Sequence, residues 1–187
     1  MERENTIRFI VPDKLHSSGI WLRTFPFLTL AIVFLFSSLL ASPKEKANGT
    51  LTYKDKTKSF TSSLKHAYLV KGPHDYEKDK TIRRIIFSPT DIAVGLQSAK
   101  SMSEAVAALK EGMTIDFDAG PRLNYWITLN GGLVQYSGTA TLDTFTKTTE
   151  SGERITGKLM IDDADAGGPK VEVEFDAPLL KTYKTAR

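Results

Sequence analysis

Residues 170–177 read KVEVEFDA, and this stretch decides the fold class. Val171, Val173 and Phe175 fall on one side of an extended chain, because successive side chains of a strand point to opposite faces. Lysine, glutamate and aspartate fill the other side. Such alternation predicts a strand with one buried and one solvated face, which is typical of an antiparallel sheet.

The same period of two recurs along the chain after residue 42. It predicts further strands at residues 50–54, 64–70, 81–87, 113–118, 123–129, 133–142 and 154–161. Turn sequences separate them, and the clearest is Asn-Gly-Gly at residues 130–132, whose glycines allow the positive φ of a tight hairpin. Short connections favour antiparallel neighbours, because a parallel crossover needs about a dozen residues or more. We therefore expect a mainly β (α+β) domain, either an antiparallel sandwich or a curled, barrel-like sheet of about eight strands.

One segment, residues 89–111, breaks this period and predicts one or two short inserted helices. Ser101 begins a capping box with Glu104, because the serine hydroxyl is placed to accept a hydrogen bond from the glutamate N–H. Apolar residues follow at helical spacing, and Gly112 is the expected end. A second short helix is expected to start at Pro89, since proline is tolerated in the first position of a helix.

Residues 25–41 read FPFLTLAIVFLFSSLLA, a run without a charge. Its length lies between that of a secretory signal core and that of a transmembrane helix. Small residues near Ala41 favour cleavage there, whereas an uncleaved run would anchor the chain in a membrane; a buried core helix is the remaining alternative. We expect residues 1–42 to be an export segment, residues 43–48 a linker and residues 49–187 a single β-rich domain. The domain is then periplasmic or secreted, or is anchored at the inner membrane and faces away from the cytoplasm.

Composition excludes several kinds of chemistry. The 187 residues include no cysteine, so a disulfide scaffold, a thiolate metal site and a thiol nucleophile are excluded. The net charge of +3 is small, and the basic residues form no nucleic-acid-binding motif. Neither H-E-x-x-H nor G-x-S-x-G occurs in the sequence. We expect no metal, no cofactor and no nucleic-acid partner.

Two groups of carboxylates lie at the ends of predicted strands. Asp116 and Asp118 alternate with apolar residues, which predicts that both face solvent. Asp162, Asp163 and Asp165 share one segment and offer oxygen ligands for calcium, but they lack the spacing of a calcium-binding loop. A polar turn between two strands is the expectation for this segment.

Several segments resemble a bacterial exported β-rich domain of unknown function. They are GTLTY at 49–53, LKHAY at 64–68, RRIIFS at 83–88, RITGKL at 154–159 and VEFDAP at 173–178. The resemblance spans roughly residues 49–180 and consists of strand and turn patterns. It implies export and β architecture, and it implies no reaction and no catalytic residue.

Candidate contact residues lie in two segments, the basic loop 71–84 and the aromatic strand 123–129. The residues predicted to bind a ligand or a partner are His74, Lys78, Lys80, Arg83, Arg84, Tyr125 and Trp126. Lysine and arginine would attract an anionic polymer or surface of the cell envelope, and aromatic side chains offer a flat apolar contact area.

Three functions fit these observations. We expect a non-enzymatic exported domain that binds an envelope protein or a small ligand. One alternative is an envelope hydrolase that uses His66 or His74 as a base beside a carboxylate. The other is the soluble part of a membrane-anchored assembly, in which residues 25–41 associate with the membrane and make helix–helix contacts there.

Overall fold

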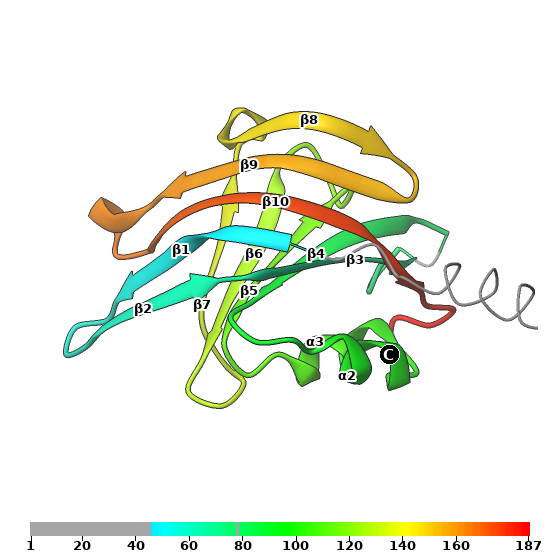
Figure 1. Ribbon diagram of the computed structural model, residues 1–187, viewed down its shortest axis with the longest axis horizontal. Helices are drawn as coiled ribbons and strands as arrows, with labels where there is room; N and C mark the ends of the chain where they lie inside the picture. Colours follow the sequence, from blue (N-terminus) through cyan, green and yellow to red (C-terminus); the bar gives the residue numbers. More distant parts are fainter. Residues whose placement is uncertain (1–45, 78) are drawn as a thin grey trace, which may run out of the picture. The chain divides into compact units, whose positions relative to one another are not determined.

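A computed structural model describes residues 46–77 and 79–187, and these residues form ten strands and two short α-helices (Figure 1). The strands are β1 (Lys46–Lys54), β2 (Ser59–Leu64), β3 (His66–Pro73), β4 (Thr81–Ser88), β5 (Gly112–Phe117), β6 (Leu123–Leu129), β7 (Leu133–Ala140), β8 (Phe145–Ser151), β9 (Arg154–Asp162) and β10 (Pro169–Thr182). The helices are α2 (Ala93–Ser98) and α3 (Met102–Ala108), and short 3-10 turns are η1 (Leu142–Thr144) and η2 (Ala164–Ala166). The predicted export segment 1–42, with its apolar run 25–41, and Lys78 lie outside the described residues.

Strand β10 contains the stretch 170–177 and joins the two halves of the sheet. Val171, Val173 and Phe175 are buried, and the intervening charged side chains lie towards solvent, as the sequence predicts. Its first part pairs antiparallel with both β1 and β9. Its last part pairs with β3 in parallel, which the short connections along the chain do not predict. A parallel pair is possible here because the two strands are far apart in sequence.

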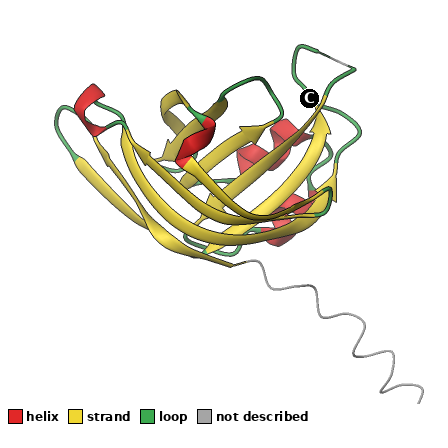
Figure 2. Ribbon diagram, turned by 90° about the horizontal axis from the view of Figure 1, so that it is seen from above, coloured by secondary structure: helices red, strands yellow, loops and turns green. Residues whose placement is uncertain are grey.

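The sheet curls on itself so that its two halves face each other (Figure 2). One half runs β2-β1-β10-β9-β8, and the other runs from β10 through β3, β4, β5 and β6 to β7. Phe145 on β8 packs on Phe117 of β5, with ring centroids 5.2 Å apart, and Tyr53 on β1 lies 6.0 Å from Tyr136 of β7. We call this apolar interior the inner core, and its burial supplies the main driving force for the curl.

Helices α2 and α3 cover the opposite, outer face of β3 and β4 (Figure 1). The outer cluster that they form with the sheet comprises Tyr68, Val70, Ile82, Ile86, Leu96, Ala99, Met102, Ala105, Leu109 and Tyr183. Strands β3 to β5 are thus buried on both faces, so β5 has no solvated side at all. The helices form a second layer on this part of the sheet, and they shelter the outer surface of the sheet next to them.

Helix α3 begins as the sequence predicts, but α2 does not. The hydroxyl of Ser101 accepts a hydrogen bond from the Glu104 N–H at 3.2 Å. Helix α2 starts at Ala93 rather than Pro89, because Asp91 accepts hydrogen bonds from the Ala93 N–H (2.9 Å) and from a tyrosine hydroxyl of β3 (2.8 Å). The tertiary contact to β3, absent from any local pattern, sets this helix start.

Gly112 is the first residue of β5 and not a helix end, which corrects the prediction. Helix α3 ends at Ala108, with Leu109 as its cap. The glycine has a φ of +136°, which reverses the chain from α3 into the sheet.

Strands β2 and β8 were not predicted, because their side chains lack apolar alternation. Strand β8 reads FTKTTES and is exposed after Phe145. The predicted strand 64–70 is two strands, interrupted at Lys65, whose N–H donates to the carbonyl of Ser88 at 3.1 Å. Leu64 therefore faces the inner core, whereas Tyr68 faces the outer cluster. Strand β1 begins at Lys46, so the last three residues of the predicted linker 43–48 belong to the sheet.

Candidate outer-face pocket

A pocket of about 360 Å³ opens on the outer face of the sheet, next to helix α3. Its lining comes from strands β4, β5 and β6, from the start of β7, from α3 and from the loop that follows β3. The side chains that concern ligand binding are Arg84, Thr114, Trp126, Thr128, Ser103 and Tyr76. These residues are far apart in the sequence, and the curled sheet with its helical cover brings them together. A volume of this size lies within the range of small-molecule sites.

A buried ion pair between Arg84 and Asp116 lies at this pocket. The two residues face each other across β4 and β5, and their side chains are 9% and 5% exposed. Arg84 donates from Nε and Nη2 to the two carboxylate oxygens, the second bond being 2.7 Å long. The guanidinium also lies over the ring of Trp126, with Cζ 5.5 Å from the ring centroid. The charge of Arg84 is therefore largely balanced where it meets the pocket.

The prediction that Asp116 and Asp118 share a solvent face is wrong. Asp116 is buried beneath the outer surface, where its carboxylate pairs with Arg84 on the neighbouring strand β4. Asp118 follows the end of β5 with a φ of +67°, which turns its side chain to Arg83 instead. The two carboxylates therefore belong to separate clusters.

Thr128 contributes a hydroxyl that the described residues leave unpartnered. Its residue is 2% exposed, and Oγ1 has no hydrogen-bond partner within residues 46–77 and 79–187. Buried hydroxyls are almost always hydrogen-bonded, since desolvation without a partner costs about 1–3 kcal/mol. Thr128 lines the pocket, but Oγ1 itself has almost no exposed surface, so a ligand reaches this hydroxyl only if the side chain turns.

Trp126 also borders a second, shallower depression of about 250 Å³ on the outer face. Its other lining residues are Asn124 on β6 and Ser137, Gly138 and Thr139 on the edge strand β7. Trp126 pairs with Thr114 on one side and with Ser137 on the other. The indole is half-buried and stands between the two hollows.

In the loop after β3, the predicted site residues His74 and Lys80 are engaged in hydrogen bonds to backbone groups of the protein. Nδ1 of His74 accepts hydrogen bonds from the N–H groups of Glu77 (3.0 Å) and Tyr76 (3.3 Å). Lys80 donates from Nζ to the carbonyl of Ala119 at 2.7 Å. His74 and Lys80 thus hold the loop in shape, and the loop brings Asp75 and Tyr76, which is 82% exposed, to the pocket.

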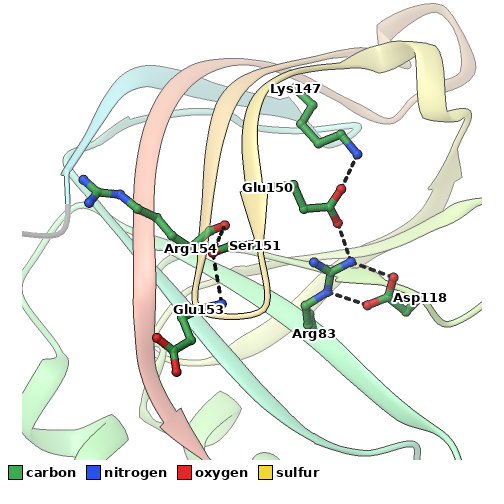
Figure 3. Close-up of polar contacts among 7 residues, drawn as sticks. All are labelled: Arg83, Asp118, Lys147, Glu150, Ser151, Glu153 and Arg154. Atoms are coloured by element: carbon green, nitrogen blue, oxygen red, sulfur yellow. Dashed lines mark hydrogen bonds and ion pairs between the residues drawn. The ribbon is translucent and has the colours of Figure 1, made fainter.

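Arg83 forms a cluster at the end of the sheet, on the other face from Arg84 (Figure 3). Its Nε and Nη2 donate to the two oxygens of Asp118 at 2.6 and 2.8 Å, and Nη2 lies 2.5 Å from Glu150 Oε1 on β8. Lys147 pairs with the same glutamate. The hydrogen bond to Asp118, and then that to Glu150, raises the pKa of Arg83. Arg83 therefore links β4 to the edge strand β8 and is not free for an anionic surface.

This cluster predicts a pH-dependent contribution to stability. The hydrogen bond from Lys147, followed by that from Arg83, holds the pKa of Glu150 below its ordinary value of 4.5. A lowered folded pKa means that ionised Glu150 stabilises the fold above pH 4.5, and that this stabilisation is lost as the pH falls through the lowered value. Glu150→Gln should therefore lower the urea midpoint at about pH 7 and lower it less at about pH 3.

The matched control is Glu153→Gln, in the turn of the same hairpin, where the carboxylate points away from the cluster (Figure 3). Its urea midpoint should follow that of the unmodified chain at both pH values. A deficit of Glu150→Gln that stays constant between the two pH values would rule out ionised Glu150 as the source.

Tyr125 and Trp126 lie on opposite faces of β6, so only Trp126 reaches the pocket. Tyr125 is buried in the inner core, and its hydroxyl donates to Asp163 in the turn after β9. Burial, together with this hydrogen bond, raises the pKa of Tyr125. Asp162 of the same segment pairs with Lys170 at 2.7 Å. The segment 162–166 is a turn closed by internal bonds, and it belongs to the fold.

Of the seven predicted site residues, the structure therefore brings Arg84 and Trp126 together at one pocket. His74 and Lys80 shape the adjacent loop, Arg83 and Tyr125 lie elsewhere, and Lys78 is outside the described residues. The sequence analysis missed Thr114, Thr128 and Ser103. The two threonines carry a weak signal, since they are polar residues within otherwise apolar strands.

Within residues 46–77 and 79–187, no group of three or more His, Asp or Glu side chains is arranged to hold a metal ion. In the same residues, no helix combines the length and the apolar character needed to cross a membrane. Comparison with known proteins found no match, whether among family models, curated proteins or solved structures.

Proposed function

We propose that this chain is an exported, non-enzymatic domain that binds a small ligand in the outer-face pocket. The observation that carries the proposal is the unpartnered, buried hydroxyl of Thr128, a residue of the pocket that Trp126 and Arg84 also line. A few placed polar groups beside an aromatic side chain are the usual composition of a small-molecule site. Export is supported by the uncharged run at residues 25–41.

A binding role fits the two histidines better than the hydrolase hypothesis does. Nδ1 of His74 already accepts two backbone hydrogen bonds, so it serves the loop as a structural acceptor. His66 is half-buried and stacked on Tyr68, with ring centroids 6.1 Å apart and the planes 4° from parallel. A general base needs a ring nitrogen directed at a substrate, and neither ring borders the outer-face pocket.

The test is a thermal-shift screen of the full chain with defined probes of several classes: neutral oligosaccharides, inorganic phosphate, adenosine, an aliphatic amine and a fatty acid. Ligands that bind the folded state raise the melting temperature. The blocking variant is Ser103→Trp, because Ser103 is exposed on α3 and lines the pocket. We expect at least one class to stabilise the unmodified chain and to lose this effect in Ser103→Trp.

The matched control is Val94→Trp, which places the same side chain on α2 at a residue that is 80% exposed and outside the pocket. It should keep the full thermal shift. No stabilisation by any class, or a shift that survives Ser103→Trp, would overturn the proposed function.

A further inference from the structure

We infer that the ligand is a neutral oligosaccharide that lies across Trp126 and occupies both hollows of the outer face; this inference rests on the proposed function. The argument starts from charge. The charged side chains that line the two hollows are Arg84 and Asp75, and Arg84 is already held by Asp116. An anion would meet the carboxylate of Asp75, and a cation would meet the guanidinium. A neutral ligand avoids both penalties.

Polar groups in the hollows suit a ligand made of hydroxyls. The unpartnered hydroxyl of Thr128 belongs to a residue that lines the larger hollow. Asn124, Ser137 and Thr139 offer an amide and two hydroxyls in the smaller one. These groups both donate and accept hydrogen bonds, as sugar hydroxyls do. Ligands with a single charged group would leave most of them unused.

The indole of Trp126 explains the apolar part of the contact. A pyranose ring presents a face of C–H groups, which packs on a flat aromatic ring, whereas its edge carries hydroxyls. Trp126 is half-buried and borders the hollows on either side, so sugar units in both hollows can contact it. Two hollows separated by one ring match a chain of sugar units better than a single compact molecule.

The experiment measures affinity by calorimetry on the full chain. The probes are the hexamer and the monomer of β-1,4-linked N-acetylglucosamine, with the glucose hexamers in α-1,4 and β-1,4 linkage. We expect one hexamer to bind more tightly than its monomer. Trp126→Ala should lower the affinity for that hexamer about tenfold or more. Trp126→Phe should recover most of the affinity, because an aromatic face remains.

A second variant tests the two-hollow arrangement. Thr139 is exposed on the edge strand and lines only the smaller hollow, so Thr139→Trp fills that hollow and leaves the larger one open. This variant should reduce the affinity for the hexamer towards that for the monomer, and it should leave the affinity for the monomer unchanged. A hexamer affinity that neither Trp126→Ala nor Thr139→Trp alters would overturn the inference.

The outcomes separate this inference from the proposed function. Binding of phosphate, adenosine, the amine or the fatty acid that Ser103→Trp blocks, with no oligosaccharide bound, overturns the sugar assignment and upholds the pocket. Absence of binding by every probe overturns both.

Discussion

Asp116→Ala should lower the free energy of unfolding by about 3–5 kcal/mol. The substitution leaves Arg84 with its guanidinium 9% exposed and without the carboxylate that receives two of its hydrogen bonds. A buried charge without a partner carries its desolvation cost uncompensated. The contact with the ring of Trp126 remains, and a cation–π contact is worth much less. Urea unfolding followed by circular dichroism measures the change.

Two further variants show whether the lone charge is the cause. Replacing both partners, Arg84→Met with Asp116→Leu, should recover most of the loss, because a buried ion pair is often matched by apolar residues of similar volume. Lys170→Ala removes an exposed pair with Asp162 and should leave the urea midpoint unchanged. If Asp116→Ala leaves the urea midpoint unchanged, as expected for Lys170→Ala, the Arg84–Asp116 pair does not stabilise the outer face.

Gly112→Ala should lower the free energy of unfolding by about 3 kcal/mol, which is the second large effect. At a φ of +136°, an L side chain is strained whatever space surrounds it. A Cβ at this position would also collide with the carbonyl group of Phe87 on the neighbouring strand β4. Neither the backbone oxygen nor the turn from α3 into β5 can yield without disturbing the sheet. The measurement is again the urea midpoint.

Gly120→Ala is the matched control. Gly120 lies in the turn between β5 and β6, its φ is outside the left-handed range, and an added Cβ would meet no atom within 4 Å. This change should be neutral or slightly stabilising, since alanine has less conformational freedom in the unfolded chain. Equal effects of the two substitutions would contradict a special backbone requirement at Gly112.

The fold was predictable wherever one face of a strand meets solvent. Strands β9 and β10 show the alternation that burial of one face imposes; β9 nearly matches its predicted range, whereas β10 continues beyond the predicted stretch 170–177 to Thr182. Prediction failed where that physical condition is absent. Strand β8 is exposed along most of its length, so its residues carry no pattern, and hydrogen bonds to β9 alone define it. Strand β5 is buried on both faces, which is why Asp116 was assigned to the wrong environment.

The sequence by itself determined the β class of the domain, the capped start of α3 and the glycine turn at residues 130–132. These features depend on neighbours a few residues apart, and local sterics and hydrogen bonding specify them. Tertiary structure alone decided the parallel pairing of β3 with β10, the start of α2 and the outer-face pocket. Arg84, Ser103 and Thr128 meet only after the sheet curls and α3 packs on it. Such contacts arise from burial summed over the whole chain, which no single segment encodes.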